Sequence, residues 1–86
     1  MENRVALIGI IVENTESVGK LNSLLSEFGE YIIGRMGVPY KEKGMNIISV
    51  AIDAPQNITS ALSGKIGALS GISAKTIYAG KAKWKN

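Results

Sequence analysis

The feature that most constrains the fold is an apolar, strand-like run that occurs twice and is followed each time by a helical pattern. The two runs are residues 5–12 and 47–52, and β-branched side chains dominate both. Such runs are typical of central strands that are covered on at least one face. The apolar positions that follow at helical spacing are Val18, Leu21, Leu24, Leu25 and Phe28 after the first run, and Ile58, Leu62, Ile66 and Leu69 after the second.

Two weaker strand patterns complete the series, residues 31–38 and residues 72–79. Gly34 and Gly37 interrupt the earlier one and indicate bulges or a close approach of another backbone. Pro39 confines that segment to the edge of a sheet or ends it. The polar residues 41–44 then predict a hairpin loop.

Turn and cap residues separate the six segments. Asn14 and Thr15 are good N-cap residues before the first helix. Pro55 suits the first turn of the second helix. We expect Gly29 and Gly71 to end the two helices, because glycine adopts the left-handed conformation that commonly follows a helix.

The resulting order is β-α-β-β-α-β, the split βαβ arrangement. We therefore predict the α+β class and a ferredoxin-like βαββαβ sandwich, a four-stranded antiparallel sheet with two helices on one face. Residues 1–80 form the single domain in this prediction. Residues 81–86 follow as a basic C-terminal tail that holds Lys81, Lys83 and Lys85.

One face of such a sheet lacks a cover. The first strand has apolar residues of both parities: Val5, Leu7 and Ile11 on one side, and Ala6, Ile8, Ile10 and Val12 on the other. Only one set can face the helices, and a chain of 86 residues has a marginal core of its own. We expect a homo-oligomer, a dimer or a tetramer, whose subunits cover the exposed sheet face and contact each other at residues 31–38.

Composition excludes several classes of function. The chain has no histidine and no cysteine, which removes most transition-metal sites, the commonest general base and the usual catalytic triads. We therefore predict a protein without a metal, a cofactor or an enzymatic activity. The longest apolar run, residues 5–12, is about a third of a membrane span, so no membrane association and a cytoplasmic location are expected.

Residues 17–21, Ser-Val-Gly-Lys-Leu, follow a hydrophobic strand and resemble the first loop of ACT-type regulatory domains. Residues 4–80 as a whole resemble the small ACT-like proteins that are named as regulators of the iron-only hydrogenase system. Residues 32–39 carry this resemblance best, and residues 48–54 support it. The group is also similar to the C-terminal sensing domain of nickel-responsive repressors.

The resemblance implies a non-catalytic regulatory or ligand-sensing domain that assembles with copies of itself. A protein partner would fit that role. It does not imply nickel binding, because the stretch that matches the metal site of the repressors, residues 38–46, contains neither histidine nor cysteine.

The first strand–helix turn is the predicted ligand site. Its candidate residues are Asn14, Thr15, Ser17, Val18 and Gly19. Backbone N–H groups at a helix N-terminus favour a small anionic ligand, and a glycine lets a ligand approach the backbone. The simpler reading of the same residues is a plain helix cap.

Three other functions were weighed. An RNA- or nucleic-acid-binding module would use the basic tail and Trp84, although the central strands lack the aromatic residues that stack on bases. Acylphosphatase-like chemistry needs an arginine in the first loop, and Arg35 is read instead as a surface charge on a strand. Glu13 and Asp53 end the two central strands, and a carboxylate pair could perform acid–base chemistry if they lay close together.

Overall fold

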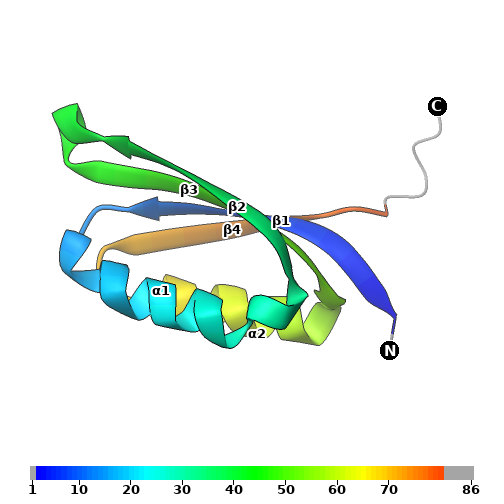
Figure 1. The fold of residues 1–86 in the computed structure, drawn as a ribbon. Coiled ribbons are helices and arrows are strands. Elements are labelled where there is room, and N and C mark those ends of the chain that lie inside the picture. The colour runs from blue at the N-terminus through cyan, green and yellow to red at the C-terminus, as the bar shows by residue number, and fades with distance from the viewer. Residues whose placement is uncertain (1, 81–86) are drawn as a thin grey trace, which may run out of the picture.

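The structure is a computed structural model, and it describes residues 2–80. Six main elements follow one another along the chain, with three single 3₁₀ turns between them (Figure 1). The strands are β1 (Asn3–Val12), β2 (Ile32–Tyr40), β3 (Met45–Pro55) and β4 (Ile72–Tyr78). The helices are α1 (Val18–Glu27) and α2 (Gln56–Gly67), and the 3₁₀ turns are η1 (Thr15–Ser17), η2 (Gly29–Tyr31) and η3 (Lys41–Lys43).

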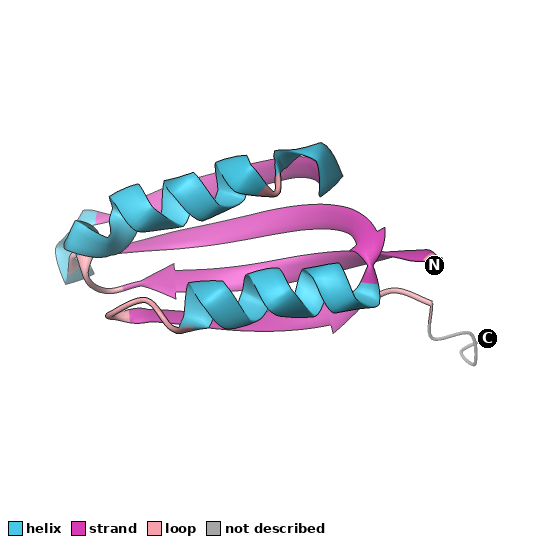
Figure 2. Ribbon diagram, turned by 90° about the horizontal axis from the view of Figure 1, so that it is seen from below, coloured by secondary structure: helices cyan, strands magenta, loops and turns pink. Residues whose placement is uncertain are grey.

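The four strands form one antiparallel sheet in the order β2-β3-β1-β4. The two strands with the strong apolar runs, β1 and β3, are therefore central, as their sequences predict. Both helices lie side by side on the same face of this sheet (Figure 2). The predicted ferredoxin-like α+β sandwich is confirmed.

The core lies between the sheet and the helices. All four even-numbered residues from Ala6 to Val12 are buried, and so are the residues that face the helices from β3. Leu21 and Leu25 close the core from α1, and Leu62 and Ile66 close it from α2. The odd-numbered set of β1, which includes Val5 and Leu7, stays exposed on the opposite face. The two parities of β1 thus separate into a covered face and an open face.

Three local predictions differ from the structure. β2 begins at Ile32 and continues past Pro39 to Tyr40, which a sheet tolerates because β2 is an edge strand. Gly29 does not adopt a positive φ; it opens the turn η2 instead. Gly71 has a φ of +71°, but α2 already ends at Gly67, so this glycine shapes the turn into β4 rather than the helix end.

The basic tail, residues 81–86, lies outside the described residues, as does Met1. None of the helices found in residues 2–80 is long and apolar enough to cross a membrane.

Candidate functional site

The β1–α1 turn, the predicted ligand site, uses several of its polar groups inside the fold. The Asn14 side chain accepts a hydrogen bond from the Glu16 backbone N–H at 3.0 Å, so Asn14 caps the 3₁₀ turn η1. Neither Asn14 nor Thr15 caps α1 as predicted, because η1 intervenes and the N-cap of α1 is Ser17. The Ser17 hydroxyl is 6% exposed and donates to the Ser70 carbonyl oxygen at 2.7 Å. These two polar side chains therefore stabilise the turn itself and its contact with the chain before β4.

A backbone contact joins the same two segments. The Glu13 N–H donates to the Gly71 carbonyl oxygen at 2.7 Å. A Cβ atom at Gly71 would overlap with Asn14, so the segments can approach this closely only because residue 71 is a glycine. The β1–α1 turn is thus anchored on the α2–β4 turn.

The other three predicted site residues point to different surroundings. Thr15 borders a hollow beside η3, and Gly19 is exposed, with open space where a Cβ atom would stand. Val18, the first residue of α1, gives its N–H to the Thr15 carbonyl oxygen and lines a separate cavity. The five predicted residues therefore do not converge on one cavity. Of the five, Val18 lines the cavity that also holds Arg35 and two asparagines.

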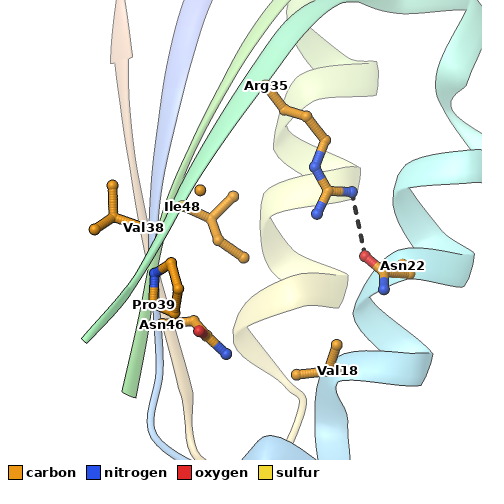
Figure 3. Close-up of a pocket in the computed structure, with 8 residues that line it drawn as sticks. Val18, Asn22, Arg35, Val38, Pro39, Asn46 and Ile48 are labelled. Atoms are coloured by element: carbon orange, nitrogen blue, oxygen red, sulfur yellow. Dashed lines mark hydrogen bonds between the residues drawn. The ribbon is translucent and has the colours of Figure 1, made fainter. Parts of the chain in front are cut away.

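We name this cavity the α1–β2 groove. Its volume is about 240 Å³, and it lies between the first two turns of α1 and the strands β2 and β3 (Figure 3). The groove is lined by Val18, Asn22, Arg35, Gly37, Val38, Pro39, Asn46 and Ile48.

The groove exists because the helix-facing positions of β2 after Ile32 hold no large aliphatic or aromatic side chain. Strand register places Arg35 opposite Val50, Gly37 opposite Ile48 and Pro39 opposite Asn46, and Val50 and Ile48 are core residues. These three positions of β2 therefore share the helix side of the sheet. A cation, a glycine and a proline cannot form the apolar contact that would draw α1 onto the edge strand.

Arg35 reaches across the groove toward α1 (Figure 3). Its Nη1 atom donates to the Asn22 side-chain oxygen at 3.2 Å. The partner is a neutral amide, and no acidic residue lines the groove. The other arginine of the chain, Arg4, is used in the fold: it donates to the Gln56 side-chain oxygen and the Ala79 carbonyl oxygen and lies 4.9 Å from the Tyr78 ring centre.

Sequence reasoning missed Arg35 as a site residue and read it as a surface charge. A usable signal was present. Arg35, Gly37 and Pro39 alternate along an edge strand, so all three take the side of the sheet that also holds the helices. A charged residue on that side predicts a gap in the helix packing.

The proposed carboxylate pair is wrong. β1 and β3 are antiparallel, with Val5 opposite Asp53 and Val12 opposite Asn46. Glu13 and Asp53 therefore lie at opposite ends of the sheet, separated by about eight residues of strand, or roughly 26 Å at the usual rise of a strand. They cannot act on one substrate atom.

Two further observations concern the chemistry of the described residues. The neighbouring Glu30 carboxylate raises the pKa of the Tyr31 hydroxyl, and desolvation adds to this effect. Within residues 2–80, no three carboxylate side chains come together as a metal ligand set would require.

The sequence matches one family model over residues 4–76, described as "TM1266-like: Iron-only hydrogenase system regulator, putative". No curated protein matches the chain. Among solved structures, the uncharacterized protein TM1266 from Thermotoga maritima is similar, with a TM-score of 0.88 and 34% sequence identity. The match covers 92% of this chain and 100% of that one.

Two more distant structures are also similar. A formyltetrahydrofolate deformylase from Pseudomonas putida KT2440 aligns with a TM-score of 0.61 and 13% identity, over 84% of this chain and 28% of that chain, and so shares the fold. CPII, a nitrogen regulatory PII-like protein from Thiomonas intermedia K12, aligns with a TM-score of 0.49 and 20% identity, over 90% and 96% of the two chains. The family match and the Thermotoga structure decide the assignment: the chain belongs to the TM1266-like family of iron-only hydrogenase system regulators.

Proposed function

We propose that this protein is a non-catalytic regulatory module that works as a homo-oligomer and responds to a small ligand. The description of its family as regulators of the iron-only hydrogenase system supports the regulatory role. The observation that carries the assembly is the apolar sheet surface that the helices leave uncovered. We name this surface the open sheet face.

The open sheet face is formed by every second residue of all four strands. Register places Val38 beside Ile47 and Ile11 in one row, and Ala51 beside Leu7 and Ile77 in another. Its exposed large apolar side chains are Val5 (46%), Leu7 (43%), Met36 (71%), Val38 (59%), Tyr40 (41%), Ile47 (41%) and Ile77 (69%). The polar residues Ser49, Asp53 and Lys75 share this face. A group of exposed apolar side chains of this size on a small domain marks an interaction site.

The shape of the open sheet face suits a second copy of the same chain. Met36 and Ile77 protrude, while a hollow of about 290 Å³ lies beside Leu7 where Gly34, Ser49 and Ala51 have small side chains. A surface with both knobs and a hollow can pack against itself in a two-fold arrangement. Four strands of about nine residues on average give a projected area of roughly 570 Å², which approaches the roughly 800 Å² that each partner buries in a standard interface.

The RNA-binding alternative has less support from the same face. RNA-recognition domains on related folds stack bases on aromatic residues of the central strands. None of the open-face positions of β1 and β3 holds an aromatic residue, and most hold aliphatic or small ones, such as Leu7, Ile47 and Ala51. That face is chemically suited to another apolar surface.

Replacement of Leu7 by aspartate tests the assembly. A charge at the centre of the open sheet face should convert the oligomer to a 9.1 kDa monomer in sedimentation experiments at micromolar concentration, because an unpaired carboxylate opposes burial. The matched control is Asn57→Asp, which adds the same charge at an exposed position of the first turn of α2 and should leave the oligomer intact. A wild-type protein that sediments as a monomer would contradict the assembly.

A further inference from the structure

The α1–β2 groove combines three kinds of side chain that together can bind a small organic acid. Arg35 supplies a cation, Asn22 and Asn46 supply amides, and Val18 and Ile48 supply apolar surface. We propose that this groove binds a small molecule with one oxyanion group, a carboxylate or a phosphate, attached to a short apolar or polar body. The inference deepens the proposed function, since such a molecule would be the ligand to which the module responds.

The charge of Arg35 is available for an anion. Its guanidinium carries five N–H donors, and the hydrogen bond to Asn22 uses one of them. Because that partner is a neutral amide, the positive charge has no counter-charge within the groove. The planar fork of donors matches the two oxygens of a carboxylate or of a phosphate.

The two asparagines can recognise a second polar group. Asn22 comes from α1 and Asn46 from β3, so they stand on different walls of the groove (Figure 3). The Asn22 oxygen accepts from Arg35, and no residue within 2–80 accepts a hydrogen bond from its amide nitrogen, which can donate to a ligand. An amide both donates and accepts, which suits a hydroxyl, an amine or a second oxygen on the ligand.

The apolar part of the groove limits the size of the ligand. Val18 and Pro39 border it, Ile48 is 7% exposed, and the absence of a side chain at Gly37 keeps it open. Its 240 Å³ lies below the roughly 300–1,000 Å³ of pockets that hold drug-sized ligands. The ligand is therefore an acid with a body of only a few carbon atoms.

A larger hollow lies between the helices, and its chemistry fits an anion less well. It measures about 450 Å³ and has Lys20 and Lys65 on its border, but Glu27 stands among them. A carboxylate in the same hollow would repel an oxyanion and neutralise a lysine. The α1–β2 groove is free of this conflict.

Titration of the isotopically labelled full-length protein tests the inference. The probes are acetate, butyrate and 2-oxobutyrate in one arm, and inorganic phosphate and glycerol 3-phosphate in the other, at constant ionic strength. The amide signal of Gly37 and the side-chain amide signals of Asn22 and Asn46 should shift in a saturable way with at least one probe. The arm that gives the tighter dissociation constant identifies the oxyanion.

Three variants separate specific binding from a general charge effect. Arg35→Gln should weaken the affinity for the responding probe by about 10- to 100-fold, the range expected for loss of a charged hydrogen bond. Lys20→Gln removes the same charge on the far side of α1 and should bind the probe as the wild type does. Gly37→Leu keeps Arg35 but fills the groove with a side chain, so it should also abolish the response. The strand should tolerate this substitution, because a Cβ at this position meets Ile48 at an ordinary 3.7 Å.

Two results would overturn the inference. One is no saturable shift with any probe up to about 10 mM, which is well above the micromolar-to-millimolar range usual for metabolite sites. The other is equal affinity of the wild type and Arg35→Gln for the responding probe. Sedimentation of the same variants keeps the two proposals apart. Arg35→Gln and Gly37→Leu should remain oligomeric, because neither side chain belongs to the open sheet face. A monomeric wild type that still binds a probe would refute the assembly alone, and an oligomer that binds none would refute the groove alone.

Discussion

At the scale of the residue, two glycines with opposite surroundings show where this chain tolerates a side chain. Gly71 has a φ of +71°, and Asn14 occupies the space beside it. Gly19 lies on the exposed side of α1 with open space around it. Glycine is necessary at the first position and only costs helix stability at the second.

We expect Gly71→Ala to lower the free energy of unfolding by more than about 2 kcal/mol, because the new methyl group meets Asn14 and alanine disfavours a positive φ. The comparison variant, Gly19→Ala, should raise it by about 0.5–1 kcal/mol, since alanine is the better helix former. Urea denaturation of both variants measures the difference. Equal effects at the two positions would mean that the contact with Asn14 is not tight.

A second prediction concerns the core. Thr59 on α2 is fully buried, and its hydroxyl has no hydrogen-bond partner within the described residues. Thr59→Val replaces the hydroxyl by a methyl group of similar size and should stabilise the protein by about 1 kcal/mol. In contrast, Thr76→Val should destabilise it, because the Thr76 hydroxyl donates to Ser63 at 3.2 Å. Thermal unfolding of the two variants should shift in opposite directions.

Single-residue roles were the least predictable from sequence. A cap role of Asn14 follows from its side chain and its position before a helical pattern, but it caps the 3₁₀ turn η1 rather than α1. The role of Gly71 depends on a contact with a residue 57 positions away, which no local pattern contains. Arg35 has its role only because α1 stops short of the edge strand.

At the scale of the element, the contact between the β1–α1 turn and the α2–β4 turn fixes the start of α1. It includes the hydrogen bond from Ser17 to Ser70 and the weaker one from Asn14 to Ser70 at 3.4 Å. Ser17 makes no side-chain bond to its own helix. Its hydroxyl therefore serves to dock α1 against β4 rather than to cap α1.

We expect Ser17→Ala to lower the free energy of unfolding by about 1–2 kcal/mol, because it leaves the Ser70 carbonyl oxygen without its donor in a part-buried contact. Amide hydrogen exchange should quicken first in the β1–α1 turn and the start of β4. Ser26→Ala, at an exposed position of the same helix, should change neither quantity appreciably. Exchange that quickens uniformly across the sheet would contradict a local docking role.

The elements themselves were predictable, because periodicity is a local property. All four strands and both helices lie where their apolar patterns place them, within one or two residues at most ends. The differences arise where tertiary context decides. An edge position allows β2 to run through Pro39, and Leu69 packs against the core from a turn rather than from α2.

At the scale of the whole molecule, charge and apolar surface are unevenly distributed. Of the ten Lys and Arg residues, three are in residues 81–86; the remaining seven equal the seven Asp and Glu residues. The domain is therefore electrically neutral, and repulsion between domains does not oppose association. The separation of the two parities of β1, which is visible in the sequence, already predicts an uncovered face.

Assembly should make stability depend on concentration. If the native subunits cover each other's open sheet faces, the midpoint temperature of unfolding should rise by several degrees between about 1 and 100 μM protein, since dilution favours unfolded monomers. The Leu7→Asp variant should unfold at one temperature over the same range. A wild-type midpoint that is independent of concentration would contradict a reversible oligomer.

The alternation of side chains along β2 has a consequence for how this family can diversify. Arg35 and Gly37 face the groove, whereas Met36 and Val38, their immediate neighbours, face the open side. If the two proposals hold, substitutions at alternate positions of one strand would alter ligand preference and subunit pairing by largely separate side chains. Two relatives could then have the same subunit interface and bind different ligands, because the residues for the two purposes alternate along β2.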